Sequence, residues 1–140
     1  MANFEIAYKE TGLYEGDGYK CEEEDNGDWS GGKRGVGVLA GTIAGITASE
    51  VMRSLGKTVF TLTADDVKNF PESKRKEIYK KKYWDVIRGD EIESQELANK
   101  IYDEQVNAGY QSIKAIQQMA GLSVSGKMTD ETIQYINNPL

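Results

Sequence analysis

Glu15 combines a residue type and a setting that suit acid–base chemistry. It lies where a predicted helix runs into a glycine-rich turn that contains Gly16 and Gly18. Glycine lets the chain bend sharply and lets a ligand approach the backbone closely. Tyr14 and Tyr19 flank this turn, and partial shielding by their rings would disfavour the charged carboxylate. A carboxylic acid that keeps its proton can act as a general acid. The alternative interpretation is an ordinary exposed glutamate beside a turn.

The composition removes most other kinds of catalysis. The chain has 140 residues, no histidine and one cysteine, Cys21. The lack of histidine excludes Ser-His-Asp and Cys-His catalysis and most zinc sites. The formal net charge of −6, from 23 acidic and 17 basic residues, argues against nucleic acid as a partner. Acid–base chemistry near neutral pH therefore falls to a carboxylate, a lysine or a tyrosine.

Three short stretches resemble ligand-binding loops, but each lacks a residue or a spacing that the loop requires. Residues 27–33 have P-loop spacing, but Arg34 stands where a Ser or Thr would hold magnesium. Residues 35–41 miss the glycine spacing of a dinucleotide-binding loop. The acidic run 22–27 resembles the start of a calcium loop, but Lys33 stands where its bidentate Glu belongs. We therefore expect neither a metal site nor a cofactor.

Hydrophobic spacing predicts a mainly helical scaffold around the candidate acid. Phe4, Ala7, Tyr8 and Thr11 recur at helical spacing and predict a helix over 3–14. Capping residues and apolar periods predict further helices. They run from Thr47 or Ser49 to Leu55, from Thr63, after Pro71 to Trp84, over 95–108, over 110–120 and from Thr129 or Asp130 onward. The apolar, glycine-punctuated stretch 36–47 predicts a short hairpin or a buried turn.

The most periodic segments predict which side chains form the core. In 95–109, one face is expected to carry Leu97, Ile101 and Gln105, with Ala98, Tyr102 and Val106 beside it. In 110–120, the side chains expected inside are Ile113, Ile116 and Ala120. We assign Trp84 and the helix over 95–108 to the core rather than to a site.

Several segments follow one another in a characteristic order. They are 15-EGDGY-19, 25-DNGDWSGG-32, 41-GTIAGIT-47, 78-IYKKKYWDVIRGDEI-92 and 102-YDEQVNAG-109. In type, order and spacing they resemble glycoside hydrolase family 108, the lysozyme-like N-acetylmuramidase and secretion activator family of phages and bacteria. The stretch 113–136 is similar to the predicted peptidoglycan-binding segment of that family, so the resemblance covers nearly the whole chain.

The resemblance implies a mainly α, lysozyme-like fold with a small β-hairpin or loop lobe. It also implies hydrolysis of the β-1,4 bond between N-acetylmuramic acid and N-acetylglucosamine. Glu15 would protonate the leaving oxygen, and Asp25 would hold the attacking water, with Asp28 as the second choice. Thr42 would be the hydroxyl partner of that water. The similarity to phage lysozymes implies inversion, although the residues alone leave inversion and retention open.

The same resemblance implies that the glycine-rich stretch lines a saccharide cleft. Tyr19 and Trp29 would stack on sugar faces, and Asp28 is a further candidate for substrate binding. The expected partner is the peptidoglycan glycan strand. We expect a monomer that binds no nucleic acid and does not insert stably into a membrane.

The predicted organisation is a glycoside hydrolase part over 1–92 and a helical C-terminal part over 93–140, packed as one globular unit. The N-terminal residues are amphipathic and charged, so no signal peptide is expected. The protein would then be made in the cytoplasm and reach the wall or periplasm by export or holin-type release. The basic run 74–82 forms either a solvated helix face or a local face that compensates the negative net charge at an anionic wall.

The alternative from another class is a non-catalytic peptidoglycan-binding or secretion and assembly protein with the same fold. Departures from the family pattern favour it: Asp17 is inserted, Ile43 and Ala44 replace a segment that usually ends in an aromatic, and Ser125 replaces an Asp. The presence of Glu15 argues against it.

Overall fold

The structure is a computed structural model that describes residues 1–15 and 18–139. Its contacts divide the chain into two compact units. We call Met1–Tyr14 with Lys76–Leu140 the helical unit, and Glu15–Arg75 the loop unit. The sequence-based boundary at residue 92 remains a prediction.

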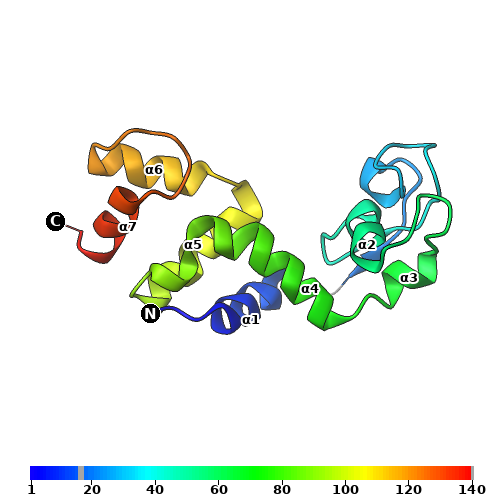
Figure 1. The fold of residues 1–140 in the computed structure, drawn as a ribbon, viewed down its shortest axis with the longest axis horizontal. Coiled ribbons are helices and arrows are strands. Elements are labelled where there is room, and N and C mark those ends of the chain that lie inside the picture. The colour runs from blue at the N-terminus through cyan, green and yellow to red at the C-terminus, as the bar shows by residue number, and fades with distance from the viewer. Residues whose placement is uncertain (16–17, 140) are drawn as a thin grey trace. The chain divides into compact units, whose positions relative to one another are not determined.

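Helices dominate the described residues and confirm the predicted fold class (Figure 1). They are α1 (Phe4–Glu15), α2 (Ala48–Leu55), α3 (Ala64–Lys68), α4 (Glu72–Tyr79), α5 (Gln95–Ala108), α6 (Gln111–Ala120) and α7 (Asp130–Asn137). A two-stranded antiparallel sheet of β1 (Tyr19–Lys20) and β2 (Thr42–Ile43) accompanies them.

Local capping explains why the short helices of the loop unit begin and end where they do. Thr47 forms a capping box with Glu50 at the start of α2, and Gly56 ends the helix at a φ of 68°. Such a left-handed conformation favours glycine. Thr63 and Asp66 form a second capping box at the start of α3. These contacts confirm the helix start at Thr63, and they show that Thr47 rather than Ser49 caps α2. Each cap depends only on residues close in sequence.

Trp84 is the centre of the helical unit's core and has no exposed surface. Its ring lies 5.8 Å from that of Phe4 and 5.9 Å from that of Tyr102, and its indole N–H donates to Oδ1 of Asp90 at 2.9 Å. A Cβ at Gly89 would come within 2.3 Å of the indole, so only glycine fits beneath it. The placement confirms that Trp84 belongs to the core.

The helix predicted from Pro71 to Trp84 changes character before its end. Regular α4 stops at Tyr79, and Lys80–Trp84 form a π-helical turn. A short 3₁₀ turn, Asp85–Ile87, follows. A π turn inserts an extra residue into the helical repeat, so it changes the direction in which the following side chains point. This irregularity places Trp84 inward while Tyr79 is also buried.

Two helical faces differ from the prediction. Leu97 on α5 is 39% exposed, whereas Ile101, Tyr102 and Gln105 are buried. The buried face of α5 is therefore centred on the Ala98 side. On α6, Ile113 is buried as expected, whereas Ile116 and Ala120 are only half-buried. The helix also buries Ser112 and Gln117, two polar residues that the apolar pattern did not predict.

Gln117 is the more deeply buried of the two and has no exposed surface. Its Oε1 accepts hydrogen bonds from the backbone N–H groups of Ser125 and Gly126, both at 3.0 Å. Its Nε2 donates to the carbonyl of Lys127 at 2.8 Å and to Oγ1 of Thr132 at 3.1 Å. The carboxamide thus holds the loop between α6 and α7, which explains why a glutamine is tolerated in the core.

Candidate functional site

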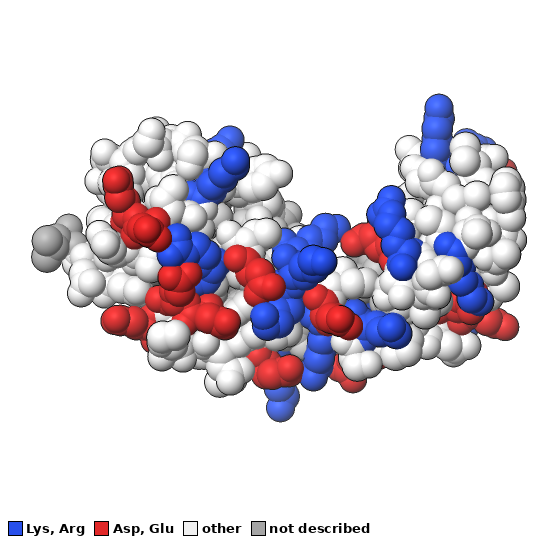
Figure 2. All heavy atoms as spheres, viewed as in Figure 1, with Lys and Arg blue, Asp and Glu red and all other residues white. Residues whose placement is uncertain are grey.

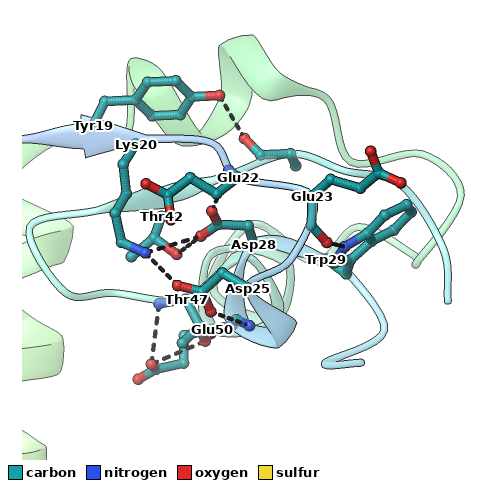
Figure 3. A network of polar contacts seen from close by, with 12 residues as sticks. Tyr19, Lys20, Glu22, Glu23, Asp25, Asp28, Trp29, Thr42, Thr47 and Glu50 are labelled. Carbon is teal, nitrogen blue, oxygen red and sulfur yellow. Dashed lines mark hydrogen bonds and ion pairs between the residues drawn. The ribbon is translucent and has the colours of Figure 1, made fainter. Parts of the chain in front are cut away.

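The short sheet of the loop unit brings together residues that are distant in the sequence. Lys20 on β1 is directly opposite Thr42 on β2, and Tyr19 is opposite Ile43. Side chains directly opposite in an antiparallel pair lie on the same face. The hairpin or buried turn predicted within 36–47 is present as a buried turn, in which Ile43 and Ile46 exchange backbone hydrogen bonds. The partner strand of β2, however, is β1, which precedes the acidic run 22–27. Lys20 and Thr42 therefore face the loop that carries Asp25 and Asp28 (Figure 3).

Asp28 has no exposed surface and connects this loop to the sheet. Its Oδ1 accepts a hydrogen bond from the Thr42 hydroxyl, and its Oδ2 accepts one from the backbone N–H of Glu22 at 2.6 Å. Its own carbonyl accepts from the N–H groups of Ala40 and Gly41, both at 2.9 Å. A buried carboxylate is costly unless hydrogen bonds satisfy it, and these contacts do so. Asp28 thereby holds the chain entering β2.

Asp25 has a more open environment. Its carboxylate is 38% exposed and forms an ion pair with the Lys20 ammonium through Oδ2. Its Oδ1 accepts from the backbone N–H of Gly27 at 2.9 Å, which caps the 3₁₀ turn Asn26–Asp28. The hydrogen bond from Lys20, followed by that from Gly27, lowers the pKa of Asp25 below its usual range. The carboxylate is thus charged and accessible near neutral pH, which suits a group that holds and orients a water molecule.

Lys20 connects the two carboxylates and was not among the residues predicted from sequence. Its Nζ forms the ion pair with Asp25 and lies 3.9 Å from Oδ1 of Asp28. The hydrogen bond to Asp25 raises the pKa of the Lys20 ammonium. One signal was present, since Lys20 is a lone cation before a run of acids. The sequence does not show that β1 pairs with β2, and only this pairing orients the side chain.

Tyr19 is half-buried in the loop unit. Its hydroxyl donates to the carbonyl of Ala40 at 2.8 Å, and the Lys68 ammonium lies 5.3 Å from its ring centroid. Burial, as the largest cause, raises the pKa of Tyr19 to about 12, so the phenol keeps its proton. A Cβ at Gly41, whose φ is 100°, would come within 2.6 Å of the ring. Gly41 therefore allows β2 to pass against Tyr19.

Trp29 follows directly after Asp28 and is partly exposed. Its indole N–H donates to the carbonyl of Glu23 at 2.9 Å, and its backbone forms an isolated bridge with Leu39. The indole is thus fixed at the edge of the acidic loop (Figure 3). A fixed, partly exposed indole offers an apolar face for stacking.

The structure brings together Asp25, Asp28 and Thr42, joined by Lys20. The Thr42 hydroxyl donates its hydrogen bond to Asp28, which was the second choice for the water-holding group, and not to Asp25. Glu15 is the last residue of α1, and its side chain lies outside the described part of the chain. Gly16 and the inserted Asp17 lie outside the described residues as well.

Two lysines of the basic run 74–82 form ion pairs with acidic residues of the helical unit. Lys76 pairs with Glu5 at 2.9 Å and Lys80 with Asp85 at 3.0 Å. Figure 2 shows basic and acidic side chains interspersed on the face in view. Such pairing is typical of a solvated helix face.

The described residues lack features that would hold a metal ion or cross a membrane. They contain no group of three or more acidic or cysteine side chains arranged to hold a metal ion. Nor does any helix among them have the length and apolar character needed to cross a membrane.

Comparison with known proteins shows a family and a related fold. The model of the family described as glycosyl hydrolase 108 matches residues 8–109. The structure of Brucella abortus SagA is similar with a TM-score of 0.66 and 22% sequence identity, over 98% of this chain and 70% of that chain. No curated protein sequence matches the chain.

Proposed function

Because the chain belongs to glycosyl hydrolase family 108, we propose that it is a peptidoglycan hydrolase of the lysozyme type. The bond cleaved would be the β-1,4 link between N-acetylmuramic acid and N-acetylglucosamine. The observation that carries the proposal is the family match over residues 8–109, which includes Glu15, Asp25 and Thr42. The charged, accessible carboxylate of Asp25 supports it.

In the proposed reaction, Glu15 donates its proton to the oxygen that leaves the anomeric carbon. Asp25 accepts a proton from a water that attacks the same carbon from the opposite face. Such an inverting reaction needs carboxyl groups about 6.5–9.5 Å apart, whereas a retaining reaction needs about 5–5.5 Å. A base on a glycine-flanked loop suits the wider arrangement, since it has to hold water rather than form a bond. No metal or organic cofactor takes part.

Thr42 has a specific place in this proposal. Its hydroxyl proton is used by the hydrogen bond to Asp28, and a hydroxyl oxygen can still accept a hydrogen bond. Thr42 would therefore accept a hydrogen bond from the attacking water, and Asp28 would fix the orientation of that hydroxyl. Asp28 has no exposed surface, so it would act through Thr42 rather than on the sugar.

The substrate would be a peptidoglycan glycan strand, with Trp29 and Tyr19 as the stacking aromatics. Both rings are partly exposed, and each has its polar group bound within the fold, the Trp29 N–H to Glu23 and the Tyr19 hydroxyl to Ala40. The protein would meet this substrate after export or holin-type release. A monomer suffices, because every proposed group is on one chain.

The test is hydrolysis of purified peptidoglycan sacculi by the full chain. We expect the turbidity of the suspension to fall and the products to carry reducing N-acetylmuramic acid ends, identified by borohydride reduction and mass spectrometry. Products with reducing N-acetylglucosamine ends would contradict the proposed bond. Co-sedimentation with the sacculi without any new reducing end would favour the non-catalytic binding protein instead.

A further inference from the structure

Lys20 occupies an unusual position in the loop unit, because one ammonium group serves both candidate carboxylates. It forms an ion pair with Oδ2 of Asp25 and lies 3.9 Å from Oδ1 of Asp28. The strand register places it opposite Thr42, whose hydroxyl binds that same Asp28 oxygen. A single side chain therefore links the exposed carboxylate to the buried one.

We propose that Lys20 is the positioning residue of the water-holding carboxylate: it fixes Asp25 relative to Thr42 by bridging Asp25 and the Asp28–Thr42 pair. The inference rests on the proposed function, in which Asp25 and Thr42 share the attacking water. It assigns to Lys20 no contact with the reacting atoms.

The contacts of Asp25 show why a positioning residue is needed. One carboxylate oxygen accepts from Gly27, within the turn that Asp25 itself caps. That contact orients Asp25 only within its own loop. The contact with Lys20 is the one that ties the carboxylate to β1, and hence to Thr42 on the neighbouring strand. Losing it would leave the relative placement of Asp25 and Thr42 to a glycine-rich loop, and misplacement by about 1 Å can cost on the order of 10²-fold in rate.

The charges around Asp25 make the effect of Lys20 electrostatic as well as geometric. Asp28 lies in the same turn, and Glu22 lies just before it and acts on Lys20. Glu50 on α2, which packs against this turn, is part of the capping box at Thr47. These neighbours are acidic, and Arg34, the cation that pairs with Glu23 in this loop, lies 3.7 Å from that side chain. The Lys20 ammonium is the cation in contact with Asp25 itself.

The direction of the pH effect follows from these contacts. The hydrogen bond from Lys20 is the largest cause that lowers the pKa of Asp25. Replacing Lys20 by an uncharged residue would raise the pKa of Asp25 toward or above its ordinary value. Asp25 would then take up a proton at a higher pH, and the acidic limb of the activity profile would move to higher pH.

The experiment compares full-length wild type with Lys20→Met and Lys20→Arg. Lys57→Met is a matched control, because Lys57 forms a similar partly exposed ion pair with Asp66 at 2.6 Å in the same unit. Initial rates of reducing-end release from solubilised peptidoglycan are measured against pH. In parallel, carboxyl ¹³C NMR follows the titration of Asp25, with its signal assigned by comparison with Asp25→Asn.

We expect Lys20→Met to stay folded, to lose about 10–10²-fold in kcat at its optimum, and to shift both the acidic limb and the Asp25 titration to higher pH. Lys20→Arg should retain the wild-type titration and recover much of the rate, since it keeps the positive charge. Lys57→Met should resemble wild type in both measurements.

The inference is overturned if the Asp25 titration of Lys20→Met is the same as in wild type. It is also overturned if Lys20→Met raises only KM and leaves the pH profile unchanged, because Lys20 would then contact the substrate. A wild type that releases no reducing ends refutes the proposed function and the catalytic part of the inference. The NMR titration is independent of activity, so it still decides whether Lys20 fixes the ionisation of Asp25.

Discussion

The hydroxyl of Thr42 donates a hydrogen bond to Oδ1 of Asp28, a carboxylate with no exposed surface. The bond connects β2 to the turn that precedes it along the chain. Thr42 therefore stabilises the fold in addition to its proposed catalytic role. A hydrogen bond to a charged group contributes about 1.5–3 kcal/mol, and a buried carboxylate that loses one is costly.

We therefore predict that Thr42→Val lowers the free energy of unfolding by about 1.5–3 kcal/mol. It should also reduce turnover more than substrate binding, because the attacking water loses its hydroxyl partner. Thr42→Ser, which keeps the hydroxyl, is the matched control and should stay near wild type. Urea denaturation and steady-state kinetics measure the two effects. A Thr42→Val protein as stable as Thr42→Ser would contradict the prediction that this hydroxyl stabilises the fold.

Trp84→Ala should be destabilising without being a catalytic defect. The indole is fully buried against Phe4 and Tyr102 and donates to Asp90. Truncating a buried aromatic costs about 3–5 kcal/mol. We expect a much lower midpoint in thermal denaturation, with wall hydrolysis per folded molecule unchanged at low temperature. Unaltered melting together with weaker substrate binding would instead place Trp84 in the site.

Gln117→Leu tests the carboxamide that holds the loop between α6 and α7. Leucine is of similar size but leaves the N–H groups of Ser125 and Gly126 without their acceptor. Buried groups left unsatisfied cost about 1–3 kcal/mol. Hydrogen exchange should show faster exchange at these two amides and little change in α1. Exchange at the wild-type rate would mean that the loop is held by other contacts.

How much of the fold and of the candidate site can be predicted from the sequence depends on how far apart in the chain the interacting residues are. The starts of α2 and α3 were predictable, because Thr47 and Thr63 bind groups only a few residues ahead. Gly56 likewise marks the end of α2 through its own backbone conformation. The mainly helical character of the chain followed from such local signals, whereas the lysozyme-like fold was implied by the family resemblance.

Interactions across the chain were less accessible. The pairing of β1 with β2 spans the whole acidic loop, so neither the position of Lys20 nor the bond between Thr42 and Asp28 could be derived from spacing. Apolar periodicity also predicted that Leu97 faces the core, whereas this side chain is exposed. It gave no indication that Gln117 is buried, because that burial depends on hydrogen bonds to the loop that follows α6. The π turn at Lys80–Trp84 has no apolar signature either.

Asp25 and the stereochemistry of the product provide a further prediction. If Asp25 holds the attacking water, hydrolysis inverts the anomeric carbon, and Asp25→Asn reduces kcat far more than it changes binding. Proton NMR of the products at early times distinguishes the two anomers before they equilibrate. An initial α product is expected. An initial β product would indicate a carboxylate nucleophile, and a fully active Asp25→Asn would transfer the role to Asp28 or to no loop carboxylate.

The most direct test of the account is the rate at which Glu15→Gln hydrolyses purified peptidoglycan sacculi. The substitution keeps the size of the side chain and removes only the transferable proton. General acid catalysis contributes about 10²–10⁴-fold, so we predict a loss in that range with unchanged circular dichroism and unchanged co-sedimentation with the sacculi. A Glu15→Gln protein that keeps more than about a tenth of the wild-type rate would contradict the assignment of Glu15 as the acid.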